Sequence, residues 1–257
     1  MEIIIFSCGI NPNFDLLNQQ VTKLNPKKWF IFYEGEQPIS TKLNKNVELF
    51  KNEIPNGKAY NFNQFKKFLN SNEIIFIIDL DDTINLKVID EFLYWHKLGW
   101  DIVYGKCLWV SKAISRNFPV PSFIPIHQVP WGTSHLFTFK SDLAKNIDEA
   151  DLIDQNNIFF DCACDVAINL RLSEQTIKRK FVNKISYYYN DNLESNHHNN
   201  KKRNLQKSNK NYIYKKKKPF LPEIDYSFLK KYEQIFSSQD LLFFHTAINE
   251  IKNNIKK

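Results

Sequence analysis

Short apolar runs rich in β-branched residues alternate with stretches of helical periodicity over the first 110 residues. Four of these runs predict strands, at 2–8, 28–35, 73–79 and 100–110. Apolar residues at helical spacing predict helices at 13–23, 59–70 and 84–98, the last with Thr83 as its N-cap. Apolar strands that alternate with helices are typical of an α/β fold with a mostly parallel central sheet flanked by helices.

The third predicted strand ends in a cluster of acids. The stretch NEIIFIIDLDDTI, residues 72–84, places Asp79, Asp81 and Asp82 directly after the apolar run. Because ligands of such sheets bind beyond the carboxyl ends of the strands, this cluster marks a candidate site. In an extended chain Asp79 and Asp81 face the same side, and their hard oxygen ligands suit Mg²⁺ or Mn²⁺. The alternative is a solvated turn in which Asp82 and Thr83 cap the next helix.

The positive charge of the chain is concentrated in one segment. The net charge is +7, yet residues 201–218 alone hold nine Lys and Arg, so the rest of the chain carries about −2. No acid lies between Ser195 and Pro222. Such a segment is typical of a solvated loop, and the alternative is a surface for a phosphate-rich partner, nucleic acid or an anionic membrane.

The remaining composition favours a cytoplasmic protein with a sizeable core. Hydrophobic residues make up 43% of the 257 residues, and no apolar run reaches the roughly 18–20 residues of a membrane span. The N-terminus lacks the basic region of a signal peptide. The four cysteines show no CxxC zinc pattern, so we interpret them as reduced thiols.

The tryptophans divide by their position. Trp95, Trp100 and Trp109 fall in the predicted helix and strand around 84–110 and are predicted to be core residues. Trp131 follows Pro130 and precedes Gly132, in a predicted loop, where its ring either packs or stacks on a sugar or a base.

Seven stretches along residues 1–200 resemble, in their order and spacing, the motifs of the family 2 glycosyltransferases with the GT-A fold. In chain order they are IIIFSCGINPN, WFIFYEGE, NGKAYNFNQFKKFL, DLDD, GTSHLFTFKSDL, CDVAINLRL and YYYNDNLESNHHN. The resemblance implies a GT-A (nucleotide-diphospho-sugar transferase) fold and a metal-dependent transfer from a nucleotide-sugar donor, with UDP as the nucleotide.

The resemblance also implies which residues hold the donor. Donor contacts are assigned to Ser7, Glu34, Gly57, Lys58, Asn61 and Asp79, with Glu34 meeting the nucleotide base. A Mn²⁺ or Mg²⁺ ion is assigned to Asp79, Asp81 and His197.

The implied chemistry is a single displacement. Asp165 stands where the family has its general base, Cys164 stands where the family has a glutamate, and Asp161 is the candidate substitute for that glutamate. Trp131, Gly132 and His135 are expected on the acceptor side. Attack from the face opposite the leaving group would invert the anomeric configuration. A retaining GT-A enzyme would show the same acidic motif, so this alternative stays open.

Three parts of the chain are expected. Residues 1–200 form the catalytic domain, residues 201–221 a basic loop or linker, and residues 222–257 a C-terminal helical extension with apolar stripes. The expected acceptor is a glycan or a lipid-linked saccharide. The alternatives are a hydroxymethylated base in phage-like DNA, reached through the segment 201–218, and an inactive GT-A fold that binds a partner.

Overall fold

The computed structural model describes residues 1–10, 14–34, 45–53, 57–111, 114–115, 117–120, 126, 131–190 and 200–216. These residues form nine strands: β1 Glu2–Ile10, β2 Lys28–Glu34, β3 Val47–Asn52, β4 Glu73–Ile77, β5 Thr83–Ile84, β6 Ile102–Trp109, β7 Ile114–Ser115, β8 Phe137–Lys140 and β9 Arg179–Tyr189. The α-helices are α1 Phe14–Leu24, α2 Gly57–Phe65, α3 Ile89–Lys97, α4 Ser141–Lys145, α5 Cys164–Ser173 and α6 Asn200–Lys215. Short 3₁₀ helices are η1 Lys66–Phe68, η2 Leu86–Val88 and η4 Glu149–Asp151.

The strands form one mixed sheet in the order β3-β2-β1-β4-β8-β6-β9-β5, with β7 paired to β6. The first four strands in this order are parallel, β8 is antiparallel to both β4 and β6, and β9 runs parallel to β6. The predicted α/β architecture is therefore confirmed. Strands β2 and β4 pair with β1 on opposite sides, so the order in which strands are added to the sheet reverses at β1.

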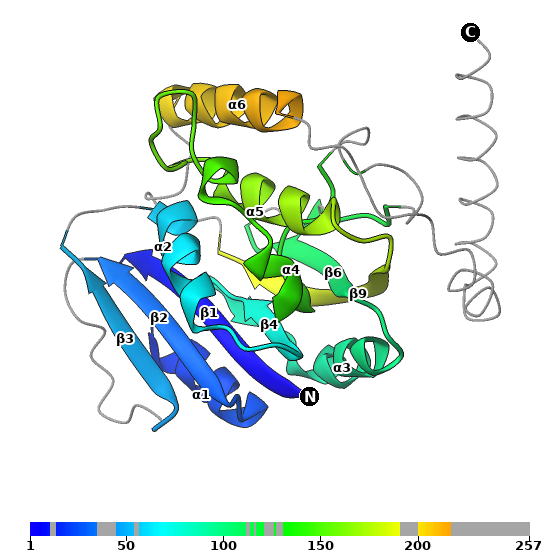
Figure 1. The fold of residues 1–257 in the computed structure, drawn as a ribbon. Helices are drawn as coiled ribbons and strands as arrows, with labels where there is room; N and C mark the ends of the chain where they lie inside the picture. Colours follow the sequence, from blue (N-terminus) through cyan, green and yellow to red (C-terminus); the bar gives the residue numbers. More distant parts are fainter. Residues whose placement is uncertain are drawn as a thin grey trace, which may run out of the picture.

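Helices cover both faces of this sheet (Figure 1), which explains why the strands are apolar on both sides. Ile4, Phe6 and Cys8 of β1 belong to the core that contains the buried side chains of α2, α4 and α5. The alternate residue Ile5 belongs to a second core, which contains those of α1 and α3. The two cores fix the register of β1, because a shift of one residue would exchange its two faces.

The first four predicted strands are confirmed as β1, β2, β4 and β6, but the segment after Asp82 is not the predicted helix. Thr83 is in β5, where it pairs with Tyr188 of β9, so it does not cap a helix. Helix α3 begins only at Ile89, after the Asn85 side chain accepts a hydrogen bond from the Lys87 amide and opens η2. Pairing with a strand some hundred residues away overrides the local helical pattern here.

The basic segment is helical over most of its length rather than the expected loop. Helix α6 lies across α5 (Figure 1) and is fixed to it by hydrogen bonds to backbone carbonyls. Buried Arg171 of α5 donates to the carbonyls of Ile213 and Lys216, and Asn209 of α6 donates to the carbonyl of Cys162. Apolar contacts hold the helix as well, because Ile213 is buried in the same core as α5, and Tyr212 and Tyr214 pack against that core.

Two of the sequence predictions cannot be followed in the structure. The helical extension expected at 222–257 and the predicted ligand His197 lie outside the described residues. None of the helices that the structure describes combines the length and the apolar character needed to cross a bilayer.

Candidate active site

A cavity of about 940 Å³ opens at the carboxyl ends of β1, β2 and β4. Each of these strands contributes to its wall: Cys8 and Gly9 come from β1, Glu34 ends β2, and Asp79 follows β4. The cavity thus lies where the order of parallel strands reverses, the usual ligand position in such sheets. The first turns of α2 and α5 and one side of α6 complete the wall.

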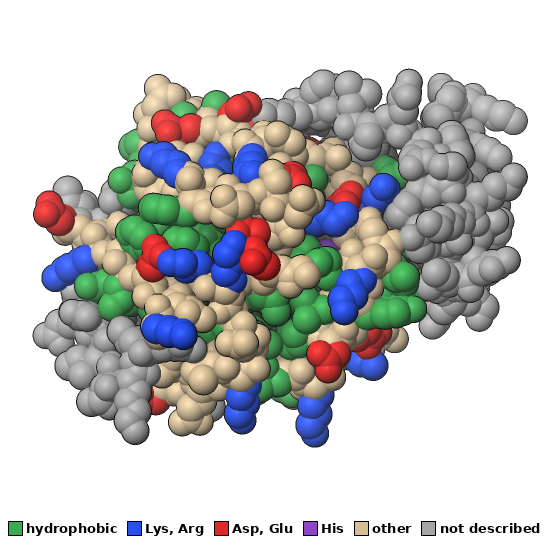
Figure 2. Space-filling view, turned by 60° about the horizontal axis from the view of Figure 1, so that its bottom comes forward, with side chains coloured by type: hydrophobic (Ala, Val, Ile, Leu, Met, Phe, Trp, Pro, Cys, Tyr) green, Lys and Arg blue, Asp and Glu red, His purple; other side chains and the backbone are tan. Residues whose placement is uncertain are grey.

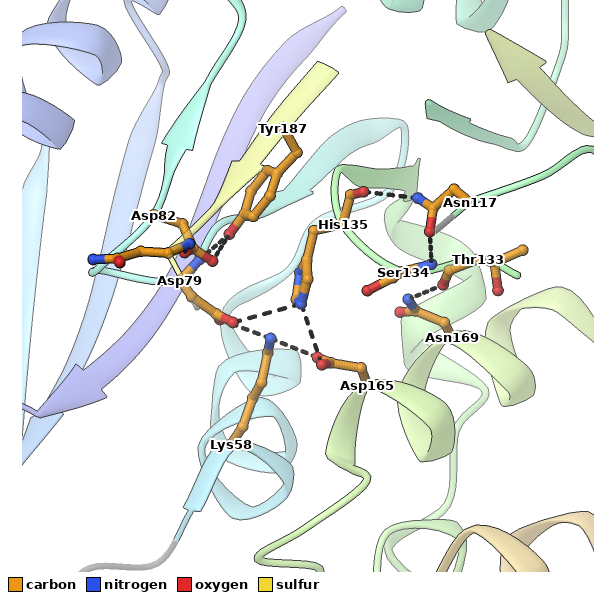
Figure 3. Close-up of polar contacts among 11 residues, drawn as sticks. Lys58, Asp79, Asp82, Asn117, Thr133, Ser134, His135, Asp165, Asn169 and Tyr187 are labelled. Atoms are coloured by element: carbon orange, nitrogen blue, oxygen red, sulfur yellow. Dashed lines mark hydrogen bonds and ion pairs between the residues drawn. The ribbon is translucent and has the colours of Figure 1, made fainter. Parts of the chain in front are cut away.

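Four ionisable side chains meet inside this cavity (Figure 3). The Lys58 Nζ lies 2.7 Å from Asp79 Oδ1 and 2.6 Å from Asp165 Oδ1. The His135 Nε2 lies 3.7 Å from Asp79 Oδ2 and 3.2 Å from Asp165 Oδ2. Two carboxylates from opposite sides of the cavity are therefore bridged by one ammonium and one imidazole.

The loop that carries His135 is held by two asparagines (Figure 3). The Asn117 side chain donates to the carbonyl of His135 at 2.8 Å and accepts from the amide of Ser134 at 3.0 Å. The Asn169 side chain, from α5, donates to the carbonyl of Thr133 at 2.9 Å. The imidazole also stacks on Tyr187, with ring centroids 4.9 Å apart. These contacts hold His135 in place although it lies in neither a helix nor a strand.

Residues 79–82 form a turn rather than the expected extended chain. The amide of Asp82 donates to the carbonyl of Asp79 at 3.2 Å. Asp82 itself is buried and accepts hydrogen bonds from the Tyr187 hydroxyl at 2.8 Å and the Asn190 amide at 2.7 Å. Of the three acids, Asp82 therefore anchors the end of β9, and Asp79 and Asp81 line the cavity.

Burial and pairing shift the pKa values of the cluster in a consistent way. Burial alone would lower the pKa of Lys58, but Asp165 and Asp79 hold it well above its ordinary value. Burial alone would raise the pKa of Asp165, but Lys58 and His135 hold it far below its ordinary value. Burial likewise opposes protonation of His135, and Asp165 raises its pKa nevertheless. Lys58 and Asp165 are thus a charged pair.

The donor set resembles a metal site, but Lys58 already occupies it. Asp79, His135 and Asp165 each offer one ligand atom, and these atoms lie within 4.8 Å of one another. Two carboxylate oxygens and an imidazole suit a divalent ion. A divalent ion would, however, add two positive charges beside the ammonium that pairs with both carboxylates. The set therefore does not fit such an ion while Lys58 keeps this position.

The structure brings most of the predicted site residues to the cavity. Its wall includes the predicted residues Glu34, Gly57, Lys58, Asn61, Asp79, Asp81, Trp131, His135, Asp161 and Asp165. Asp81 lines the cavity but lies outside the group of possible metal ligands, which contains His135 instead. His135, predicted on the acceptor side, therefore lies beside Asp79.

Two predicted site residues have other surroundings. Ser7 is fully buried on the opposite face of β1, where its hydroxyl accepts a hydrogen bond from the Trp29 indole at 3.0 Å. Strand alternation turns it away from the cavity that its neighbour Cys8 lines. Gly132 packs on Phe118, whose ring would be only 2.4 Å from a Cβ at this position. The glycine therefore leaves room for the Phe118 ring.

Sequence reasoning missed several cavity residues. Trp109, predicted to be core, is half-buried and lines the cavity beside Tyr189, with ring centroids 5.2 Å apart. The larger omission is α6, which contributes Lys202, Arg203, Gln206, Lys207 and Lys210 to the wall. Their spacing of three and four residues would have indicated one helix face, had the segment been recognised as a helix.

The comparisons with known proteins bear on the fold. No family model and no curated protein matches the chain. Among solved structures, residues 1–349 of S. aureus TarS match with 16% identity and a TM-score of 0.51, over 74% of this chain and 60% of that one. The same fragment in complex with UDP matches with 15% identity and a TM-score of 0.50, over the same shares. A longer TarS structure matches with 16% identity and a TM-score of 0.52, over 74% of this chain and 37% of that one.

The architecture is a GT-A-like α/β fold, and its cavity lies at the carboxyl ends of the parallel strands. TarS is one protein of this fold, and it has been crystallised with UDP. At 15–16% identity the likeness concerns the fold alone. The chain spans 60% and 37% of the lengths of the TarS structures it matches.

Proposed function

We propose that this chain is a glycosyltransferase that moves a sugar from a UDP-linked donor to an acceptor hydroxyl. The observation that carries the proposal is the cavity at the topological switch, where Glu34, Asp79, Lys58 and Asp165 lie together. The fold shared with TarS, which has been crystallised with UDP, supports a uridine nucleotide as the donor's leaving group. The cavity of about 940 Å³ is large enough for a donor and part of an acceptor.

The proposed donor side follows the first strands. Glu34 ends β2 at the cavity wall, and the Gly57 amide lies 3.4 Å from its Oε1, so the carboxylate is oriented for the nucleotide base. Gly57 has a φ of +71°, a backbone conformation that glycine adopts without strain. Asp79 and Asn61 complete the donor side in this proposal.

The proposed general base is Asp165, at the first turn of α5. Its carboxylate is oriented by Lys58 and His135, and its side chain is one-third exposed to the cavity. A carboxylate held by an ammonium and an imidazole is a weak base. Proton removal from the acceptor hydroxyl therefore requires the contact with Lys58 to loosen as the donor binds. Attack from the face opposite the diphosphate would invert the anomeric centre.

The proposed acceptor is a glycan or a lipid-linked saccharide. Trp131 is half-buried at the cavity wall, and its ring offers an apolar face of the kind on which sugars stack. Metal dependence, on Mn²⁺ or Mg²⁺ at Asp79, Asp81 and His197, stays a prediction of the sequence. Such an ion would stabilise the charge on the leaving diphosphate.

The test is a donor screen. The purified chain is incubated with a panel of UDP-sugars, with and without Mn²⁺, and UDP release is measured before mass spectrometry of candidate acceptors. We expect release from one donor, loss of that release in Asp79→Asn, and normal release in the control Asp142→Asn, an exposed acid of α4. A chain that neither binds UDP nor releases it from any donor would be an inactive fold, the remaining alternative.

A second candidate function is glycosylation of a base in DNA. The observation that favours it is helix α6, which has four basic side chains along the cavity and contains no acid in its sequence. On the face drawn in Figure 2, by contrast, basic and acidic side chains are interspersed. A basic wall beside the proposed base suits the phosphates of a nucleic-acid acceptor. A base within a duplex would have to be flipped into the cavity.

A further inference from the structure

The position of Lys58 is unusual for a lysine. Its side chain is only 11% exposed, deep in the cavity, and its ammonium lies within 2.7 Å of one oxygen from each of two carboxylates. Those carboxylates come from elements far apart in the chain, the turn after β4 and the start of α5. Lys58 itself is the second residue of α2, whose buried residues Phe62 and Phe65 belong to the core. The ammonium is thus placed by the packing of three elements.

Lys58 does more than balance charge within the core, because all three members of this group line the cavity. Asp79 is 19% exposed and Asp165 is 33% exposed, so a ligand in the cavity reaches the same space. An ammonium has three N–H donors, and the two carboxylates account for two of them. The third would serve an anionic oxygen of a ligand, which reaches the nitrogen once a carboxylate moves aside, because the nitrogen itself exposes less than 1 Å².

We propose that the Lys58 ammonium is the resident cation of this site: it takes the place of a divalent ion between Asp79 and Asp165, and it contacts the diphosphate of the nucleotide. The second half of this statement rests on the proposed function. The first half concerns the protein alone. This first half explains why Asp79, His135 and Asp165 have the ligand types of a metal site although the Lys58 ammonium already pairs with both carboxylates.

The other charges of the cavity agree with a built-in cation. Glu34, Asp79, Asp81, Asp161 and Asp165 line the cavity, and so do Lys58 and four of the basic residues of α6. Acidic and basic side chains therefore match without an added ion. A diphosphate would meet cations of the protein on both sides, from α2 and from α6.

The first experiment measures Mn²⁺ binding without nucleotide, by loss of the free-ion signal in electron paramagnetic resonance. The wild type is expected to bind no Mn²⁺ at concentrations up to about 1 mM. Lys58→Met, which keeps the length of the side chain and removes its charge, is expected to bind Mn²⁺ at the vacated carboxylates. The double variant Lys58→Met with Asp165→Asn should lose this binding. Lys140→Met is the matched control, because Lys140 pairs with a single carboxylate, Asp101, outside the cavity.

Lys58→Met leaves two carboxylates without their cation and is expected to be less stable. Mn²⁺ should therefore raise its unfolding temperature and leave that of the wild type unchanged. This readout holds even if the variant is only marginally folded. Lys58→Arg keeps the charge and should behave like the wild type in both measurements.

The second experiment measures UDP binding by calorimetry, in EDTA and in Mn²⁺. We expect the wild type to bind UDP equally in both, and Lys58→Met to bind roughly ten- to hundredfold more weakly in EDTA, with recovery in Mn²⁺. Wild-type UDP binding that requires Mn²⁺, or wild-type binding of Mn²⁺ alone, would overturn the proposal. Absence of UDP binding in both buffers would overturn the diphosphate contact and the proposed function. The Mn²⁺ experiment would then still decide whether Lys58 is the resident cation.

Discussion

At the scale of single residues, the structure separates Asp165, the predicted general base, from Asp161, the predicted substitute for the family's glutamate. Asp165 lies within 3.2 Å of both Lys58 and His135, whereas Asp161 is exposed at the edge of the cavity. We expect Asp165→Asn to lower sugar transfer by about 10²–10⁴-fold, because an amide cannot accept the proton of the acceptor. UDP binding should change little. Steady-state transfer rates and calorimetry with UDP provide the two measurements.

Asp161→Asn is the control for this prediction. Asp161 has the same residue type and lines the same cavity, but it is not part of the charged cluster. It should retain most of the transfer activity. The reverse result, an inactive Asp161→Asn and an active Asp165→Asn, would show that the motif has been aligned one helical turn too late.

A second prediction at this scale concerns His96, which is buried on the far side of the sheet. Its Nδ1 lies 3.0 Å from the Trp100 carbonyl and must donate to it, and its Nε2 lies 2.9 Å from the Thr138 hydroxyl. Burial lowers the pKa of His96 to about 4. Since its ordinary pKa is about 6.5, the unfolded chain binds more protons than the folded one between these values. The free energy of unfolding should therefore fall as the pH drops from about 6.5 to 4.

Urea denaturation at pH 7.5 and at pH 4.5 tests this contribution of His96. The loss due to His96 is at most roughly 3 kcal/mol, and other groups add to the total. His96→Gln, which cannot gain a proton, should show a smaller difference between the two pH values than the wild type. Equal differences in both proteins would mean that His96 titrates normally in the folded state.

At the scale of elements, variants of α6 test whether the acceptor carries phosphates. Changing Arg203, Lys207 and Lys210 to Gln should weaken binding of duplex DNA and flatten its dependence on salt. Log affinity falls with log salt by about 0.9 for each phosphate neutralised, so three lost contacts would reduce the slope by up to about 3. Fluorescence anisotropy of labelled duplex at several salt concentrations measures both effects.

The control for the α6 prediction removes three exposed lysines outside α6 that do not line the cavity, Lys67, Lys87 and Lys97. This variant has the same net charge as the first. Equal losses in both variants would indicate only a general attraction to the basic chain. No binding of duplex at low salt in the wild type would leave the glycan as the proposed acceptor.

At the scale of the whole molecule, the cavity joins parts of the chain that are far apart in the sequence. Its wall contains residues from the ends of β1 and β2, from α2, and from α5 and α6. A ligand held there should stabilise the entire fold by mass action. UDP at a hundred times its dissociation constant should add about 2.7 kcal/mol to the free energy of unfolding. Uridine, which lacks the diphosphate, should stabilise less at the same concentration, and thermal unfolding curves compare the two. An equal effect of UDP and uridine would argue against a diphosphate site.

Much of this architecture could be predicted from local patterns. The apolar runs of β1, β2 and β4 and the helical spacing of α1 and α2 are strong because both faces of the parallel sheet are buried. The position of Asp79 followed from the same reasoning, since a strand that ends in charge must end at an edge of the sheet. Motif order placed Lys58, His135 and Asp165 among the site residues.

The sequence alone therefore determined the fold class, the edge of the sheet that carries the site, and most of the side chains in it. Only the tertiary structure decided how these side chains pair. The contact of Lys58 with two acids, the pairing of Thr83 with β9 and the docking of α6 on α5 all join residues that are distant in the chain. Periodicity reports which face of an element is buried, whereas a salt bridge or a docked polar helix depends on distances between elements. For that reason an apparent metal motif has a lysine at its centre, and an apparent loop forms a wall of the cavity.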